Sequence, residues 1–152
     1  MRAFHAWWLV LLVALVGCVS TPQATATRDA EAKRFLSHPG FASLYVFRPD
    51  TLTVEMDDSV LYVDDRLIGA TLPGTFFRVD VQPGARIVSS SAAGSTNLKL
   101  DARPGELYFV QLNVTSGNSR LALVDPDKGK RALLECCALM ENWAPEQRPL
   151  LR

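Results

Sequence analysis

The chain has 152 residues, with 16 Lys and Arg against 16 Asp and Glu, so its formal net charge is zero. A chain of this length fits a single domain. Its balanced charge argues against a surface dedicated to nucleic acid, and we expect no nucleic-acid partner.

The first seventeen residues predict a secretory leader. Arg2 is followed by an uncharged, mainly aliphatic run from Ala6 to Val16, and then by Gly17, which is the layout of a signal peptide. A helix that spans the hydrocarbon core needs about 20 apolar residues, so this run is too short for a permanent span. Removal of residues 1–17 takes away one charged residue and leaves a net charge of −1.

The residues at the end of this run resemble a known signal. Leu15-Val16-Gly17-Cys18 is similar to the lipoprotein signal of bacteria, in which the leader is cut before the cysteine. The resemblance implies that the sulfur of Cys18 receives a diacylglycerol and that its amino group is acylated. The lipid bilayer then becomes a partner, because stable anchoring takes two or more acyl chains. Val19, where an Asp would retain the protein at the inner membrane, implies the outer membrane of a Gram-negative envelope, facing the periplasm. The alternative is an ordinary cleaved leader.

Residues 18–41 are expected to form the lipidated tether and a short helix. Residues 19–27 are small and polar, as in a flexible linker. Residues 28–36 predict the helix, which ends before Pro39-Gly40. His38 is the only histidine outside the leader, so sites built from several histidines are excluded. We expect no metal and no other cofactor.

Residues 42–141 predict a mainly β domain. Segments 44–47 and 60–63 are apolar on both faces, as central strands would be. Further strands are predicted at 67–69, after a turn at Asp64-Asp65-Arg66, in the alternating runs 77–81, 98–101 and 108–114, and near 120–124. Such alternation is typical of antiparallel strands with one face on a core. Pro-Gly pairs at 73–74, 83–84 and 104–105 predict type II turns.

The C-terminal part predicts a second helix. Asp125-Pro126 is a plausible N-terminal cap, and Leu133, Cys136, Cys137 and Met140 then recur at helical spacing. A helix with this apolar face would close over the sheet, and residues 142–152 predict an irregular tail. The expected fold is a single antiparallel β-sandwich, immunoglobulin-like, with a short N-terminal helix and a C-terminal helix packed on it.

Cys136 and Cys137 are adjacent in sequence. Consecutive Cα atoms lie about 3.8 Å apart, below the usual range for a disulfide, so a bond between them would be strained. The first interpretation is that they pack as small apolar residues on a helix face. The alternative is a redox role, with a vicinal disulfide or an intermolecular bridge in the oxidising periplasm.

The central segments resemble a family of small bacterial lipoproteins that carry a domain of unknown function. The matching pieces are LYVFRP at 44–49, VLYVD at 60–64, IG at 68–69, GTFFRVDVQPG at 74–84 and LYFV at 107–110, so the resemblance covers residues 42–130. The order of strand, Asp turn and Pro-Gly hairpin is also similar to PEGA-type β-sandwich modules. Those modules usually carry glycine where this chain has Asp65. The resemblance implies a β-sandwich in the envelope and transfers no catalytic residue.

The sequence contains no grouping typical of an enzyme. Asp57-Asp58 and Asp64-Asp65 are acidic pairs that could serve a glycosidase or bind calcium, but solvated turn residues explain them better. No nucleophile elbow, phosphate loop or Cys-His pair occurs. We therefore expect no catalytic site.

Four residues are candidates for contact with a partner. Arg48 follows a buried strand, where it would cap a loop through carbonyl groups, pair with Asp80, or contact a ligand. Phe76, Phe109 and Trp143 are expected to be exposed aromatics, which suit a protein partner.

Three functional hypotheses follow. The leading one is a membrane-anchored envelope lipoprotein whose β-sandwich is a non-enzymatic interaction or assembly module for another envelope protein. The second is a small-molecule or lipid binding domain, with a pocket between the sheet and the C-terminal helix lined by Cys136, Cys137 and Met140. The third, an envelope hydrolase, is the least favoured.

Overall fold

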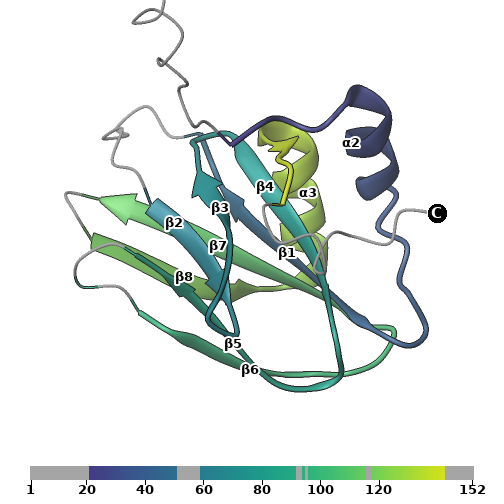
Figure 1. Cartoon of the computed structure of the whole chain (residues 1–152). Coiled ribbons are helices and arrows are strands. Elements are labelled where there is room, and N and C mark those ends of the chain that lie inside the picture. Colours follow the sequence, from purple (N-terminus) through teal and green to yellow (C-terminus); the bar gives the residue numbers. More distant parts are fainter. Residues whose placement is uncertain (1–20, 51–58, 92–93, 95, 116–117, 143–152) are drawn as a thin grey trace, which may run out of the picture.

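The computed structural model describes residues 21–50, 59–91, 94, 96–115 and 118–142 (Figure 1). The expected leader, Cys18, the pair Asp57-Asp58 and all of the expected tail except Asn142 lie outside the described residues. The described chain is mainly β, with two helices and two sheets.

Five strands form the first sheet, in the order β8-β7-β1-β4-β9. They are β1 (Ala42–Arg48), β4 (Thr75–Val81), β7 (Leu107–Thr115), β8 (Asn118–Val124) and β9 (Ala138–Leu139). β1 is central and is buried along its whole length, which confirms the prediction drawn from its apolar residues on both faces.

Four strands form the second sheet, in the order β3-β2-β5-β6. They are β2 (Ser59–Val63), β3 (Arg66–Thr71), β5 (Gly84–Ser90) and β6 (Leu98–Ala102), and neighbouring strands run antiparallel. β2 alternates between buried and half-buried residues. The prediction of a central strand at 60–63 is confirmed, since β2 lies between β3 and β5, but one of its faces is only half-buried, at Val60 and Tyr62.

The expected all-antiparallel arrangement is also wrong. β1 pairs with β7 in parallel, and β4 pairs with β9 in parallel. Parallel neighbours need a long crossover connection. Between β1 and β7 the chain passes through β2 to β6, and between β4 and β9 it passes through β5 to β8 and the C-terminal helix α3 (Pro126–Cys136). Alternation in sequence reports which face of a strand is buried and carries no information on strand direction.

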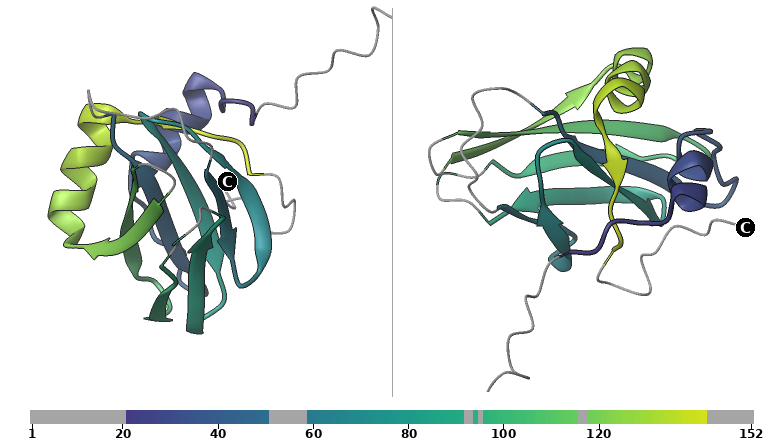
Figure 2. Two further views of the ribbon diagram at one scale, coloured as in Figure 1. Left: turned by 90° about the vertical axis from the view of Figure 1, so that its left-hand side faces the viewer. Right: turned by 90° about the horizontal axis from the view of Figure 1, so that it is seen from above.

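Two cores lie on the two faces of the first sheet. The core between the sheets joins residues of both, among them Leu44 and Val46 of β1 with Leu61 of β2. The outer core contains Tyr45 and Phe47 of β1, because successive residues of a strand point to opposite faces. The helices α2 (Ala26–Ala32) and α3 contribute to this outer core, and Figure 2 shows them beside the first sheet.

The C-terminal helix begins as predicted but ends earlier. Asp125 caps it, since its Oδ1 accepts hydrogen bonds from the backbone N–H groups of Asp127 and Lys128. The helix ends at Cys136, and Cys137 is already extended. Cys137 and Met140 therefore do not share a helix face with Leu133, because the chain leaves the helix to pair β9 with β4. Neither described helix has the length and apolar character needed to cross a bilayer.

The expected tether is shorter than predicted. Of residues 19–27, those from Thr21 onward are described, and Gln23 pairs antiparallel with Met140. The Ala24 N–H donates to the Leu139 carbonyl at 2.9 Å. Small polar composition suggests a flexible linker, but these backbone groups are satisfied by the edge of the first sheet.

Gly129 of α3 is buried because the helix lies directly on Phe109 of β7. A Cβ at position 129 would come within 2.4 Å of both Cβ and Cγ of Phe109. We expect Gly129→Ala to lower the free energy of unfolding by about 1–3 kcal/mol through overpacking. Helix propensity alone would raise it by about 1 kcal/mol. Urea unfolding of the variant, with Arg131→Ala as an exposed control on the same helix, decides the sign. A variant as stable as the wild type would show that α3 does not pack tightly against Phe109 of β7.

Tyr45 connects the first sheet with α2. Its hydroxyl donates to the carbonyl of Ala32 at 2.9 Å, and burial raises the pKa of Tyr45 to about 12 from 10.0. Nearby Arg78 opposes this rise, and Asp80 adds to it. The folded chain therefore holds the phenolic proton more tightly than the unfolded chain does. This contribution to stability is complete below pH 10 and is lost as the pH rises from 10 to 12.

Tyr45→Phe tests this link. At neutral pH we expect a loss of about 1 kcal/mol, since the variant leaves the Ala32 carbonyl without its donor. Between pH 10 and 12 the wild type should lose on the order of 2–3 kcal/mol more than the variant does. Urea unfolding at pH values on both sides of this interval measures the difference. Parallel pH profiles for the two proteins would contradict it.

Candidate functional site

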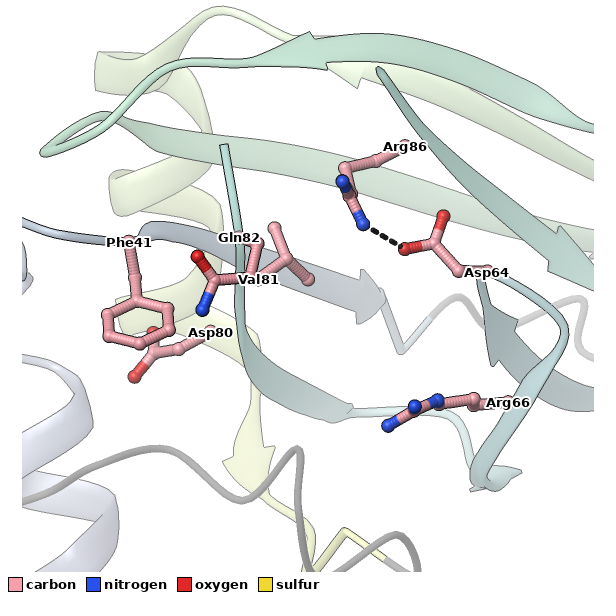
Figure 3. Close-up of a pocket in the computed structure, with 7 residues that line it drawn as sticks. All are labelled: Phe41, Asp64, Arg66, Asp80, Val81, Gln82 and Arg86. Atoms are coloured by element: carbon pink, nitrogen blue, oxygen red, sulfur yellow. Dashed lines mark hydrogen bonds and ion pairs between the residues drawn. The ribbon is translucent and has the colours of Figure 1, made fainter. Parts of the chain in front are cut away.

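A cavity of about 480 Å³ lies at one end of the two sheets (Figure 3). Its volume is in the range of small-ligand sites, about 300–1,000 Å³. The lining residues come from four segments: Phe41 before β1, Asp64 and Arg66 at the β2–β3 turn, Asp80, Val81 and Gln82 at the end of β4, and Arg86 of β5. We call this cavity the end pocket.

The β2–β3 turn forms one wall of the end pocket. Asp64 and Asp65 both have positive φ, of 51° and 61°. Two successive residues of this kind are typical of a type I′ hairpin turn, where glycine or a short polar residue is preferred. Asp65 thus adopts a conformation that also suits the glycine of PEGA-type modules, and the turn prediction at 64–66 is confirmed.

The side chain of Asp64 fastens this turn to β5. Its Oδ2 accepts a hydrogen bond from the Arg86 guanidinium at 2.8 Å, and its Oδ1 accepts one from the backbone N–H of Ile87 at 2.9 Å. Figure 3 shows the first of these contacts across the pocket. The carboxylate is therefore neutralised by a cation and held in place by an amide.

The second carboxylate of the pocket is also paired. Asp80 Oδ1 accepts a hydrogen bond from the Ser43 hydroxyl at 2.5 Å and lies 3.5 Å from Nε of Arg78. The side chains of Arg78 and Asp80 are almost wholly buried. Arg78 also donates to the Leu36 carbonyl and lies 5.6 Å from the ring centre of Tyr45. Asp80 therefore joins the pocket to the outer core.

Arg66 gives the end pocket its uncompensated charge. Its side chain is exposed, and within the described part of the chain no carboxylate lies at ion-pair distance from it. Of the other charged residues that line the pocket, Arg86 is paired with Asp64, and Asp80 is paired with Arg78. An exposed guanidinium such as that of Arg66 suits a carboxylate or phosphate group.

Arg48 makes the carbonyl contact predicted for it. The side chain is buried, and its NH1 donates to the carbonyl of Thr71 at 3.2 Å. Asp80, the alternative partner, is paired with Arg78 instead. A buried Arg48 is not placed to contact a partner protein directly.

The prediction that Phe76 and Phe109 are exposed is wrong. Phe76 and Phe109 are fully buried in the outer core, where Phe109 stacks with Tyr45 at 5.1 Å between ring centres. The alternation of apolar and polar residues predicts that one face of β4 and β7 is exposed to solvent, but α2 and α3 cover that face. Trp143 lies outside the described residues.

Cys136 and Cys137 form a vicinal disulfide, with Cα atoms 3.7 Å apart. The vicinal disulfide of the alternative interpretation is therefore present, whereas the redox role stays a prediction. Cys137 is also buried in the outer core, as the first interpretation expected. The bond lies where α3 passes into β9. His38 lies in a turn, where its Nδ1 accepts a hydrogen bond from the Gly40 N–H.

Sequence reasoning missed the end pocket. The sequence predicts a turn at Asp64 and Arg66. Gln82 and Arg86 are single polar residues in or next to separate strands, so the sequence does not indicate a site there. The only local signal was the Asp turn itself. Across the described ranges, no three His, Cys, Asp or Glu side chains gather in a way that could hold a metal ion.

Comparison with known proteins shows a match to the segments that form the end pocket. The family model described as "Protein of unknown function (DUF2846)" matches residues 38–126, which include strands β1 to β8 and every residue that lines the end pocket. A Haemophilus influenzae protein described as uncharacterized is 29% identical over 125 residues, covering 78% of this chain and 74% of that protein. The resemblance to a family with a domain of unknown function is thereby confirmed. Because the family model matches more than half of the chain, this protein belongs to the DUF2846 family.

Proposed function

We propose that this chain is a lipoprotein held at the periplasmic face of the outer membrane by acylated Cys18, and that its two sheets form a β-sandwich that acts as a non-enzymatic interaction or assembly module. The observation that carries the proposal is the sequence Leu15-Val16-Gly17-Cys18 at the end of an apolar run. It ends three residues before Thr21, where the described fold begins. In this proposal the sandwich is PEGA-like.

The end pocket is the binding site of the module. It suits an anionic group on an envelope protein, because Arg66 is exposed and lines the pocket, as does Arg86. The pocket is formed by turns and strand ends that are fastened by Asp64 and Asp80, so its shape does not depend on a partner. A preformed site binds without the cost of ordering its own loops.

The same pocket supports the second candidate, a small-molecule binder. The pocket expected between the sheet and α3 receives no support, because Gly129 lies against Phe109 and Leu133 is fully buried there. A small anionic ligand would use Arg66 and Arg86 instead. A hydrolase is less favoured, since both carboxylates of the end pocket are tied up in ion pairs.

Cys18→Ala tests the anchor. Cells that express the wild-type chain and grow with labelled palmitate should incorporate the label, and the variant should not, because the thiol and the new amino group belong to one residue. Membrane fractionation should release the variant into the soluble envelope fraction. A wild-type chain that incorporates no labelled palmitate would contradict the proposed lipid anchor at Cys18.

Arg66→Glu tests the pocket, since it replaces the unpaired cation by an anion. We expect a partner crosslinked in intact cells to lose most of its yield with this variant, while Arg131→Glu, an exposed change on α3, keeps it. Quantitative mass spectrometry of the crosslinked material measures the yield. Equal recovery with both variants would place the binding surface elsewhere.

A further inference from the structure

The first described residues form a strap along the edge of the first sheet. The strap comprises residues 21–24, and Gln23 pairs antiparallel with Met140 just after β9. The Ala24 N–H donates to the Leu139 carbonyl at 2.9 Å, and the Glu141 N–H donates to the Pro22 carbonyl at 2.8 Å. Two backbone hydrogen bonds, one on each side of Gln23, thus join the strap to one short segment of the chain.

Thr21 ties the strap to the second sheet. It is only 6% exposed, and its Oγ1 accepts a hydrogen bond from the backbone N–H of Ala70 in β3 at 3.0 Å. A Cβ at Gly69 would lie 3.3 Å from Cγ2 of Thr21, so the threonine methyl is close to β3. The strap therefore joins β9 of the first sheet to β3 of the second.

The segment after the strap is fixed as well. The Asp29 carboxylate accepts a hydrogen bond from the Leu139 N–H at 2.8 Å, and Arg28 forms an ion pair with Glu141. The strap is thus held along its length and at the helix that follows it. The chain at Thr21 belongs to the fold and not to a free linker.

This fixation limits how far the fold can lie from the lipid. Cys18 precedes Thr21 by three residues, and three extended residues span at most about 10 Å. An acylated Cys18 has its sulfur and amino group at the membrane interface. The part of the surface around Thr21 must then lie against the headgroups.

The β3–β4 turn, residues 72–74, connects the two sheets and lies beside this point. Leu72 in this turn is 41% exposed. Its N–H donates to Oγ1 of Thr75, and its carbonyl accepts from the same hydroxyl. Gly74 donates to the Arg48 carbonyl and accepts from the Ala138 N–H, so the turn is held in place. A turn held in this way, with one exposed leucine, is suited to shallow contact with a bilayer.

The end pocket lies at the other end of β3. Thr21 is bonded to Ala70, whereas Arg66 begins the strand four residues earlier, about 13 Å away along the strand. Figure 1 shows the β3–β4 turn and the β2–β3 turn at opposite ends of the two sheets. A membrane at the end with the β3–β4 turn therefore leaves the pocket end free.

We propose that a lipid bilayer is the partner of the strap and the β3–β4 turn, which dock directly on its surface, so that the domain has one fixed orientation and its end pocket points away from the membrane. This inference rests on the lipidation of Cys18 in the proposed function. In this arrangement the lipidated residue is joined directly to the folded domain, with no long flexible linker between them.

The test uses the full chain, purified from bacterial membranes and placed in vesicles of phosphatidylethanolamine and phosphatidylglycerol that contain a photoactivatable phospholipid. Mass spectrometry of the N-terminal peptide first establishes whether Cys18 carries lipid. After illumination, lipid adducts are mapped on the peptides with Leu72 and Leu123, because Leu123 is 53% exposed on β8 and serves as the matched apolar control. We expect several-fold more adduct at Leu72.

A linker variant separates anchoring from orientation. Inserting about ten Gly and Ser residues between Ser20 and Thr21 frees the domain from the anchor without touching the strap. The contrast between Leu72 and Leu123 should then fall several-fold, while the lipid on Cys18 is retained. Equal adduct on both leucines in the lipidated native chain would overturn the inference and leave the proposed function intact. An unmodified Cys18 would overturn both.

Discussion

The structure depends on the complete burial of β1. Every residue of this strand is buried, and its alternate side chains enter two different cores. Leu44 and Val46 meet the second sheet, whereas Tyr45 and Phe47 meet the helices. A strand of this kind cannot shift its register by one residue without exchanging the two sets of side chains. Its neighbours β4 and β7 are therefore fixed as well, and these carry the walls of the outer core and, through Asp80, one side of the end pocket.

The burial of β1 also explains why charged residues are found inside the fold. Arg78 and Asp80 of β4 lie next to β1 on the covered face, and both are nearly inaccessible. They are tolerated because each has polar partners: Ser43 donates to Asp80, and Arg78 donates to the Leu36 carbonyl. This network begins beneath α2 and ends at the end pocket. The pocket is thus supported by contacts of the core and not by its surface loops alone.

Local patterns in the sequence predicted most of the strands and both helices, because alternation, Pro-Gly turns and the Asp125 cap depend on neighbouring residues. β5 and β9 were missed or seen only in part. β5 has a mixed pattern of exposed and buried residues, and β9 has only two residues. The exposure of Phe76 and Phe109 was predicted wrongly since their strands alternate, and nothing in a strand's own sequence says that a helix covers its second face. The end pocket joins four segments whose proximity depends on the sheet order, so no spacing rule could reveal it.

The strap is bonded to residues far along the chain, since Pro22 accepts a hydrogen bond from Glu141 and Ala24 donates one to Leu139. Its partners on β9 are synthesised after all the other strands. A chain that is synthesised in order from its N-terminus therefore exposes residues 21–24 well before their partners are made. The edge of the first sheet is closed last, and until then it presents unpaired backbone groups to any neighbouring chain. The backbone hydrogen bonds between residues 21–24 and the segment around β9 are accordingly among the last contacts of the fold that can form.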